Sequence, residues 1–172
     1  MSDFRGFIQE RLGSRATDDF MDWLEGIGFY SCPAAKAHHG NYDGGLYNHS
    51  MKVADELQNL TNKLGLTWVY PESPWVVGLL HDICKCDDYK YDFEKSDSIE
   101  WNPHHSGHGA KSIIMLAGHF PLSEEEKYCI LYHMGAFTDE KEWKFYSQAV
   151  RTYPNVLYTH TADMIASQIY GV

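Results

Sequence analysis

Apolar side chains recur along this chain mostly at the spacing of an α-helix. The clearest case is residues 46–64, where the following positions repeat at intervals of three and four residues: Leu46, His49, Val53, Leu57, Leu60 and Leu64. This spacing predicts an amphipathic helix with one buried stripe, and Gly65 is a typical residue to end it. His49 therefore lies among the apolar side chains of the stripe.

A second segment is apolar on every side. Residues 75–80, Trp-Val-Val-Gly-Leu-Leu, leave a helix no face for solvent, so we expect this helix at the centre of the fold. Ser73 is a typical N-cap and Pro74 suits the first helical position, which places the start of the helix there. His81 and Asp82 follow directly and should lie at the inner end of the most buried segment.

Capping signals place further helices. Thr17 can cap a helix that ends near residues 26–28. Ser123 and Glu126 form a capping-box pattern for a helix that runs through Met134. Three more helices are expected at about 108–118, from a Thr138 cap to about Arg151, and at 155–169 after Pro154.

Alternating polarity at 89–93 and 99–101 is typical of short strands that pair as a hairpin. The predicted fold class is therefore an all-α helical bundle with room for one small β-hairpin around 89–101. The aromatic residues of this hairpin could wall a base-binding pocket or, more commonly, pack in the core; they are Tyr89, Tyr91, Phe93 and Trp101.

Length and charge narrow the function classes. A chain of 172 residues fits a single domain over 1–172, and its 44% hydrophobic and 22% charged residues are typical of a globular protein. Lys and Arg total 14 against 24 Asp and Glu, and the net charge of -10 disfavours attraction to nucleic acid or to an anionic membrane. No apolar run reaches the length of a signal peptide or of a membrane span.

The cysteines indicate a reducing compartment. They form no C-x-x-C pair and no recognisable disulfide framework: Cys32, Cys84, Cys86 and Cys129. We therefore expect reduced thiols and a cytoplasmic location. A zinc role for Cys84 and Cys86 is the less favoured alternative, because the usual ligand spacing is missing.

The ten histidines are the compositional outlier, and His81-Asp82 is the most demanding position. A buried, ionised carboxylate is costly unless it is paired, and the C-terminal end of a helix disfavours an anion further. A metal ion would compensate His81 and Asp82 together. The alternative is a salt bridge from Asp82 to Lys85, with His81 as a hydrogen-bonded core histidine.

Other helices also direct a His or Asp inward. Asp163 shares a helix face with Val156, His160 and Ala166, His133 follows Cys129 and Ile130 on an inward face, and His108 opens a helix after Gly107. Taken singly, each residue is more often a hydrogen-bonded core group than a ligand. Taken together, imidazoles and carboxylates from several helices are the ligand set of Fe, Mn, Zn, Ni or Co.

The order of these residues, His49, His81-Asp82 and Asp163 on separate predicted helices, resembles the signature of the HD-domain superfamily of metal-dependent phosphohydrolases. Residues 33–39 and 44–50 resemble the segment before the first ligand in a subset that includes the HD domain of bacterial 3′→5′ exoribonucleases. His81-Asp82-Ile83-Cys84-Lys85 is similar to the common His-Asp-Ile-Gly-Lys form, with Cys84 in place of glycine.

The resemblance extends over about residues 30–168. Gly107-His108-Gly109 and His133-Met134-Gly135 are similar to the motifs of the two extra histidines in members that bind two metals, and Thr161-Ala162-Asp163 is similar to the final motif. One departure concerns the substrate side. The exoribonuclease-type domain often has His-His-Gly where this chain has Met134 in the middle.

The resemblance implies an all-α HD fold with one or two divalent transition metals per chain, Fe, Mn, Ni, Co or Zn. The first metal would be held by His49, His81, Asp82 and Asp163. The second would be held by Asp82, His108 and His133, so that Asp82 bridges the two.

The implied activity is hydrolysis of a phosphomonoester or phosphodiester by a metal-activated hydroxide, with Asp82, Lys85 and His39 as catalytic residues. Lys85, His38 and His39 would bind the substrate, a nucleotide or small phosphorylated metabolite. His38 and His39 fit a packed loop equally well, and Lys85 also fits a surface lysine near a helix end. His104 and His105 are expected near the mouth of the site, and His119 and His160 are expected to be structural.

Two other functions use the same residues. A minority of HD proteins, similar to inositol oxygenase, use four His and two Asp around two irons to activate oxygen. Processing of short nucleic acid, as in the exoribonucleases, is the second alternative. No stable nucleic-acid complex is expected, because the chain has no room for an additional oligonucleotide-binding domain and its net charge is -10.

Overall fold

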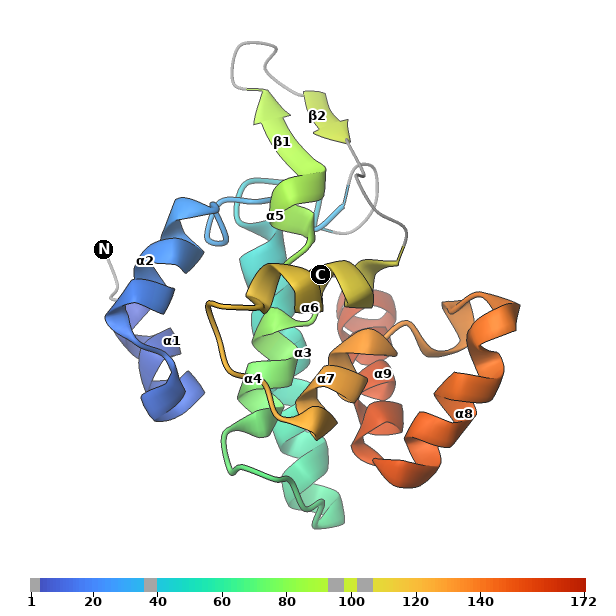
Figure 1. The fold of residues 1–172 in the computed structure, drawn as a ribbon. Helices are drawn as coiled ribbons and strands as arrows, with labels where there is room; N and C mark the ends of the chain where they lie inside the picture. Colours follow the sequence, from blue (N-terminus) through green and yellow to red (C-terminus); the bar gives the residue numbers. More distant parts are fainter. Residues whose placement is uncertain (1–3, 36–39, 93–97, 102–106) are drawn as a thin grey trace.

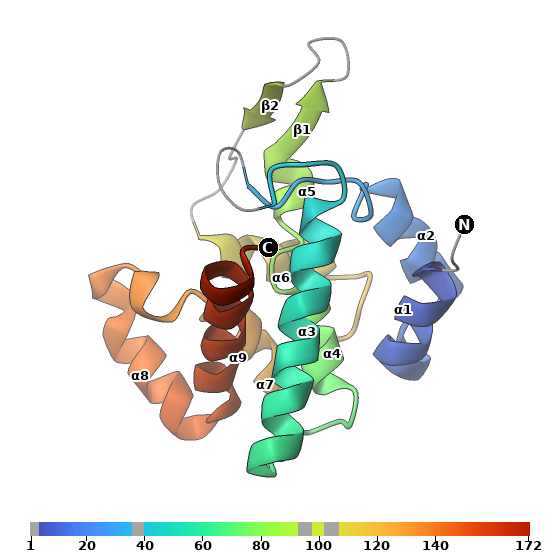
Figure 2. The same cartoon turned by 180° about the vertical axis from the view of Figure 1, so that it is seen from behind.

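The computed structural model describes residues 4–35, 40–92, 98–101 and 107–172. Two helices, α3 (Gly45–Leu64) and α4 (Ser73–Leu80), run side by side in opposite directions through its centre (Figures 1 and 2). The bounds of α3 match the predicted 46–64. Gly44 and Gly65 flank it with φ of 79° and 65°, in the left-handed region that glycine adopts without strain.

Helix α4 is buried along its whole length, as its uniformly apolar sequence predicts. It approaches α3 closely because Gly78 has no side chain, and a Cβ there would lie 2.3 Å from the Cα of Ala54. This tight crossing brings His81 and Asp82, which follow α4, beside His49 on α3.

The remaining elements surround this pair (Figure 1). α9 (Asn155–Met164) packs on α3, and α7 (Glu124–Leu131) packs on α4, α6 and α9. The outer helices are α6 (His108–Leu116), α8 (Trp143–Thr152), α1 (Phe4–Leu12) and α2 (Asp18–Gly26), with α1 and α2 on the flank opposite α8. Single turns complete the described chain: 3-10 turns at Gly13–Arg15, Gly135–Phe137 and Glu140–Glu142, and a π-helical turn at Ile165–Tyr170.

The predicted hairpin is present at one end of the bundle, after the short helix α5 (Lys85–Asp88). Strand β1 (Tyr89–Asp92) pairs antiparallel with β2 (Ser98–Trp101), so that Tyr89 lies opposite Trp101. Tyr89 packs against the core, which agrees with the commoner of its two interpretations. Phe93 and the side chains of Tyr91 and Trp101 lie outside the described part of the chain. The fold class is thus the predicted helical bundle with one small hairpin.

Two capping predictions are confirmed. The Phe20 N–H donates to Thr17 Oγ1 at 3.2 Å at the start of α2. At the start of α7, Ser123 and Glu126 form the reciprocal bonds of a capping box. None of the described helices is long and apolar enough to cross a membrane.

Two boundaries around α7 and α8 differ from the prediction. Helix α7 ends at Leu131 rather than Met134, because Tyr132 leaves helical geometry with φ -111° and ψ 17°. His133 therefore lies in the following turn. Thr138 does not cap α8, since Asp139 caps a 3-10 turn first and the helix begins only at Trp143.

The start of α4 also differs. Ser73 lies inside the first turn rather than at the cap, because its hydroxyl donates to the buried Glu126 carboxylate at 2.7 Å. Pro74 occupies the first turn as predicted. The predicted last helix is α9 continued by the π-helical turn.

Candidate metal centre

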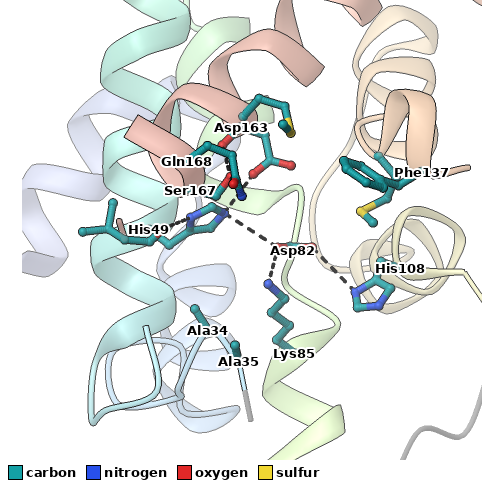
Figure 3. Close-up of a pocket in the computed structure, with 13 residues that line it drawn as sticks. Ala34, Ala35, His49, Asp82, Lys85, His108, Phe137, Asp163, Ser167 and Gln168 are labelled. Atoms are coloured by element: carbon teal, nitrogen blue, oxygen red, sulfur yellow. Dashed lines mark hydrogen bonds and ion pairs between the residues drawn. The ribbon is translucent and has the colours of Figure 1, made fainter. Parts of the chain in front are cut away.

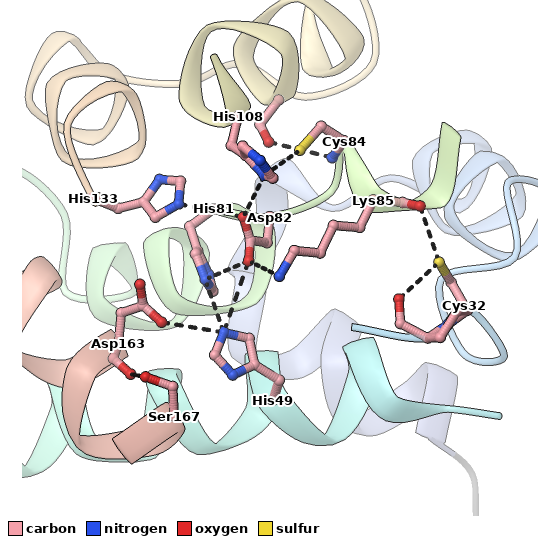
Figure 4. A network of polar contacts seen from close by, with 12 residues as sticks. Cys32, His49, His81, Asp82, Cys84, Lys85, His108, His133, Asp163 and Ser167 are labelled. Atoms are coloured by element: carbon pink, nitrogen blue, oxygen red, sulfur yellow. Dashed lines mark hydrogen bonds and ion pairs between the residues drawn. The ribbon is translucent and has the colours of Figure 1, made fainter. Parts of the chain in front are cut away.

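The structure brings all six predicted metal ligands together (Figure 4). They come from five parts of the fold: His49 from α3, His81 and Asp82 from the turn after α4, His108 from the first position of α6, His133 from the turn after α7, and Asp163 from α9. The ligand atoms of three subsets lie within 4.8 Å of one another: His49, His81 and Asp163; His81, Asp82 and His133; and Asp82, Cys84 and His108. Residues far apart in sequence thus meet around Asp82, but none of these subsets contains both His108 and His133, the predicted partners of Asp82 at the second metal.

Three of the histidines are oriented by main-chain carbonyls. His49 Nδ1 contacts the Val172 oxygen at 3.0 Å, His81 Nδ1 contacts the Gly78 oxygen at 2.9 Å, and His133 Nδ1 contacts the Ile130 oxygen at 2.7 Å. A carbonyl oxygen can only accept, so each Nδ1 must carry the proton. Each ring then turns its Nε2 atom toward the centre of the cluster, where the lone pair of a neutral ring can bind a metal, which is the arrangement of metal-binding histidines.

His49 and His81 point these lone pairs at each other. Their Nε2 atoms are 3.3 Å apart, and His49 Nε2 is also 3.3 Å from Asp163 Oδ1. Two acceptors cannot form a hydrogen bond, and burial lowers the pKa of His81, so protonating that ring is unfavourable. Ligand atoms about 2.1 Å from one metal lie roughly 3.0–3.4 Å apart. The spacing therefore fits a shared cation.

Asp82 joins the two halves of the cluster. Its Oδ2 lies 3.4 Å from His81 Nε2 and 3.8 Å from His49 Nε2, while its Oδ1 lies 3.3 Å from His133 Nε2 and 4.0 Å from His108 Nδ1. Asp82 Oδ1 and His133 Nε2 are both buried without a hydrogen-bond partner. A buried polar atom left unpaired costs about 1–3 kcal/mol, and a bound cation would pair both.

Lys85 forms the predicted alternative contact. Its ammonium lies 2.7 Å from Asp82 Oδ2, and its side chain is 15% exposed. This salt bridge satisfies one carboxylate oxygen and leaves Oδ1 facing His133 and His108 unpaired. The salt bridge alone therefore does not account for the cluster.

The charges of the cluster favour ionised carboxylates. Burial would raise the pKa of Asp82, but Lys85 and His81 hold it well below its ordinary value. Burial opposes ionisation of Asp163 too, yet contact with the His49 imidazole, 3.3 Å away, lowers its pKa. Burial disfavours charge on His133, and contact with Asp82 nevertheless raises its pKa, so a metal would displace a proton there.

A cavity of about 530 Å³ opens onto the cluster (Figure 3). His49, Asp82, Lys85, His108 and Asp163 line its floor. Apolar wall residues are Ala34, Ala35, Met134, Phe137, Met164 and Val172, and polar ones are Ser167 and Gln168. The volume lies within the usual range for small-molecule sites, about 300–1,000 Å³.

Several histidines lie away from the ligand clusters or outside the described residues. His38 and His39, predicted to bind substrate, and His104 and His105 are among the residues that the structure does not describe. His119 stacks on Trp23 with ring centroids 4.3 Å apart. His160 contacts the main-chain oxygen of His133 through Nδ1 at 2.9 Å. Both of these last two agree with the predicted structural roles.

Cys84, for which a zinc role is only the less favoured alternative from the sequence, lies in the cluster beside Asp82 and His108. It is fully buried, and its Sγ lies 3.8 Å from His108 Nδ1. Burial raises the pKa of its thiol to about 12. The missing ligand spacing counts against Cys84 in the sequence, although Cys84 lies inside the His81–Lys85 motif.

Comparison with protein-family models, curated proteins and solved structures finds no match to this chain.

Proposed function

We propose that this protein is an HD-type, metal-dependent phosphohydrolase that cleaves a phosphomonoester or phosphodiester of a nucleotide or small phosphorylated metabolite. The observation that carries the proposal is the pair of buried, inward-facing Nε2 atoms of His49 and His81, 3.3 Å apart, beside ionised Asp82 and Asp163. Such a donor set suits Fe, Mn, Co, Ni or Zn.

The residues divide into two metal sites around Asp82. His49, His81, Asp82 and Asp163 would hold the first ion, and Asp82, His108 and His133 would hold the second. When bound, two adjacent divalent ions polarise phosphoryl oxygens and lower the pKa of coordinated water. The unpaired Asp82 Oδ1 and His133 Nε2 support the second site.

Lys85 would bind the phosphate. Its ammonium borders the cavity, and contact with Asp82 raises the pKa of Lys85 despite burial, so the side chain stays charged. A metal at Asp82 would compete with Lys85 for the carboxylate and leave the ammonium to non-bridging phosphate oxygens. As a point charge close to the reacting group, Lys85 would stabilise charge that develops there.

The cavity supports a small substrate. Its apolar wall, formed in part by Met134, Phe137 and Met164, suits the carbon framework of a leaving group rather than a second highly charged group. The net charge of -10 argues against a stable complex with a nucleic-acid chain.

An oxygenase would use the same four His and two Asp, and Lys85 is the feature that favours phosphate over an uncharged substrate. The test is a substrate panel on metal-free protein reconstituted anaerobically with each candidate metal. We expect metal-dependent release of p-nitrophenol from p-nitrophenyl phosphate or its bis-ester, or of phosphate from nucleoside monophosphates. The Asp82→Ala variant should lose this activity, and the matched His119→Ala variant should retain it.

Two results would contradict the proposal. Ester hydrolysis that is equal in both variants would separate the activity from the cluster. Oxygen consumption by the iron-loaded protein, with no hydrolysis of any phosphate ester, would favour the oxygenase.

A further inference from the structure

We propose that the Cys84 thiolate is a ligand of the second metal, together with Asp82 and His108, and that this position therefore takes a thiophilic ion such as Zn²⁺. This inference rests on the two-metal centre of the proposed function and adds a sulfur ligand to it. Thiolate ligands select zinc and other soft ions over Mg²⁺ or Mn²⁺.

The first observation is the placement of the sulfur. Cys84 Sγ lies 3.8 Å from His108 Nδ1, and both atoms lie within 4.8 Å of a carboxylate oxygen of Asp82 (Figure 4). Sulfur at about 2.3 Å and nitrogen at about 2.05 Å from a tetrahedral zinc are roughly 3.6 Å apart. The sulfur and nitrogen therefore already have nearly the separation of two ligands on one ion.

The second observation is independent of the cysteine. Asp82 Oδ1 is the carboxylate atom that faces His108, at 4.0 Å, and it is buried without a hydrogen-bond partner. The whole Asp82 side chain is only 6% exposed, so water cannot easily compensate this atom. Asp82 Oδ1, which also lies 3.3 Å from His133 Nε2, therefore offers a carboxylate ligand beside the sulfur and His108 Nδ1.

The backbone couples these groups mechanically. The Cys84 N–H donates to Ser112 Oγ on α6 at 3.3 Å, and α6 is the helix that begins with His108. The turn that carries Cys84 is thereby attached to the helix that carries the histidine. Coordination would form the metal–sulfur bond, break the S–H bond and release the proton to the buffer.

A different role is open to the same atoms. The Cys84 S–H could donate to His108 Nδ1 and orient the ring, which would leave His108 to coordinate through its other nitrogen. In that case the sulfur would not contact the ion. A thiolate ligand predicts a sulfur-to-metal charge-transfer band and a sulfur shell around the metal, whereas a thiol that only orients His108 predicts neither.

The decisive experiment uses the full chain loaded with Co²⁺ or Zn²⁺. The Co²⁺ protein should show a thiolate-to-metal charge-transfer band in the near ultraviolet. Cys84→Ser should remove the band and Cys86→Ser should retain it, because Cys86 belongs to none of the ligand clusters among the described residues. X-ray absorption of the Zn²⁺-loaded wild type, which needs no variant, should show a sulfur shell at about 2.3 Å.

Metal that binds with a purely nitrogen and oxygen shell would overturn the inference, as would a band that survives in Cys84→Ser. Hydrolysis of the same phosphate esters, measured on the same samples, separates the two proposals. Hydrolysis without a sulfur shell would refute only the Cys84 ligand. A sulfur shell without hydrolysis of any ester would refute only the phosphohydrolase.

Discussion

Lys111 on α6 forms ion pairs with two carboxylates of α5, and the loss of unfolding free energy on its removal can be calculated. Its side chain is 3% exposed, and its ammonium lies 2.5 Å from Asp88 Oδ1 and 2.7 Å from Asp87 Oδ2. Lys85 lies three residues before Asp88 on α5, and His108 lies three residues before Lys111 on α6. The Lys111 contacts therefore link the helix that carries Lys85 to the helix that carries His108, two side chains of the proposed site.

The Lys111→Met change keeps the length of the side chain and removes its charge. It leaves Asp88, whose side chain is 6% exposed, as a buried carboxylate without its partner. Removal of one member of a buried pair costs about 3–5 kcal/mol. Asp87 is 43% exposed and adds only about 0–1 kcal/mol. We expect the low end of the range, about 3 kcal/mol, because local rearrangement can hydrate Asp88.

Urea unfolding of the metal-free protein at neutral pH measures this cost. A double-mutant cycle with Asp88→Asn isolates the pair, and we expect a coupling of about 2 kcal/mol, so that the double variant recovers most of the loss. Metal titration of Lys111→Met should show weaker binding at the site that includes His108 than at the His49 site. A decrease of less than about 1 kcal/mol in the unfolding free energy of Lys111→Met would refute the reasoning. Additive effects of Lys111→Met and Asp88→Asn in the double variant would refute it as well.

Three further predictions concern the fold around the cluster. Gly78→Ala should destabilise the protein by about 1–3 kcal/mol in thermal or urea unfolding, because the added Cβ meets the backbone of Ala54. Burial opposes ionisation of Glu126, yet hydrogen bonds from Arg15 lower its pKa below the ordinary value. The ionised Glu126 side chain therefore contributes to the free energy of unfolding above about pH 4.3, and this contribution is lost as the pH falls. In Glu126→Gln, the free energy of unfolding should therefore decrease less steeply as the pH falls below about 4.3. An unchanged pH dependence would contradict this assignment. His119→Ala should leave metal content unchanged, since it stacks on the surface away from the ligand clusters.

The apolar pattern predicted the elements whose structure is decided locally. The stripe of α3 and the uniformly apolar α4 depend on burial alone, and both helices appear where the pattern predicts them, although α4 begins at Ser73 rather than after it. The start of α8 was mispredicted because Asp139 competes with Thr138 as a cap, which residue preferences cannot rank. Helix α1 was not predicted, although it buries Ile8 and Leu12.

For the candidate site, the sequence identified groups that need a partner but not the contacts between elements. His49 and Asp163 could be placed on inward faces from spacing alone. The Val172 oxygen that orients His49 and the approach of Cys84 to His108 depend on how separate elements pack. Such contacts leave no periodic signal in the chain.

Metal content per chain is the most direct test of the central claim that these side chains form a metal centre. Elemental analysis of protein purified anaerobically and reconstituted with divalent metal should give two ions per chain in the wild type. It should give one ion in His108→Ala and in His133→Ala, and none in Asp82→Ala. A fully active wild type with a single ion would contradict the two-metal centre, and equal metal content in wild type and Asp82→Ala would contradict the centre itself.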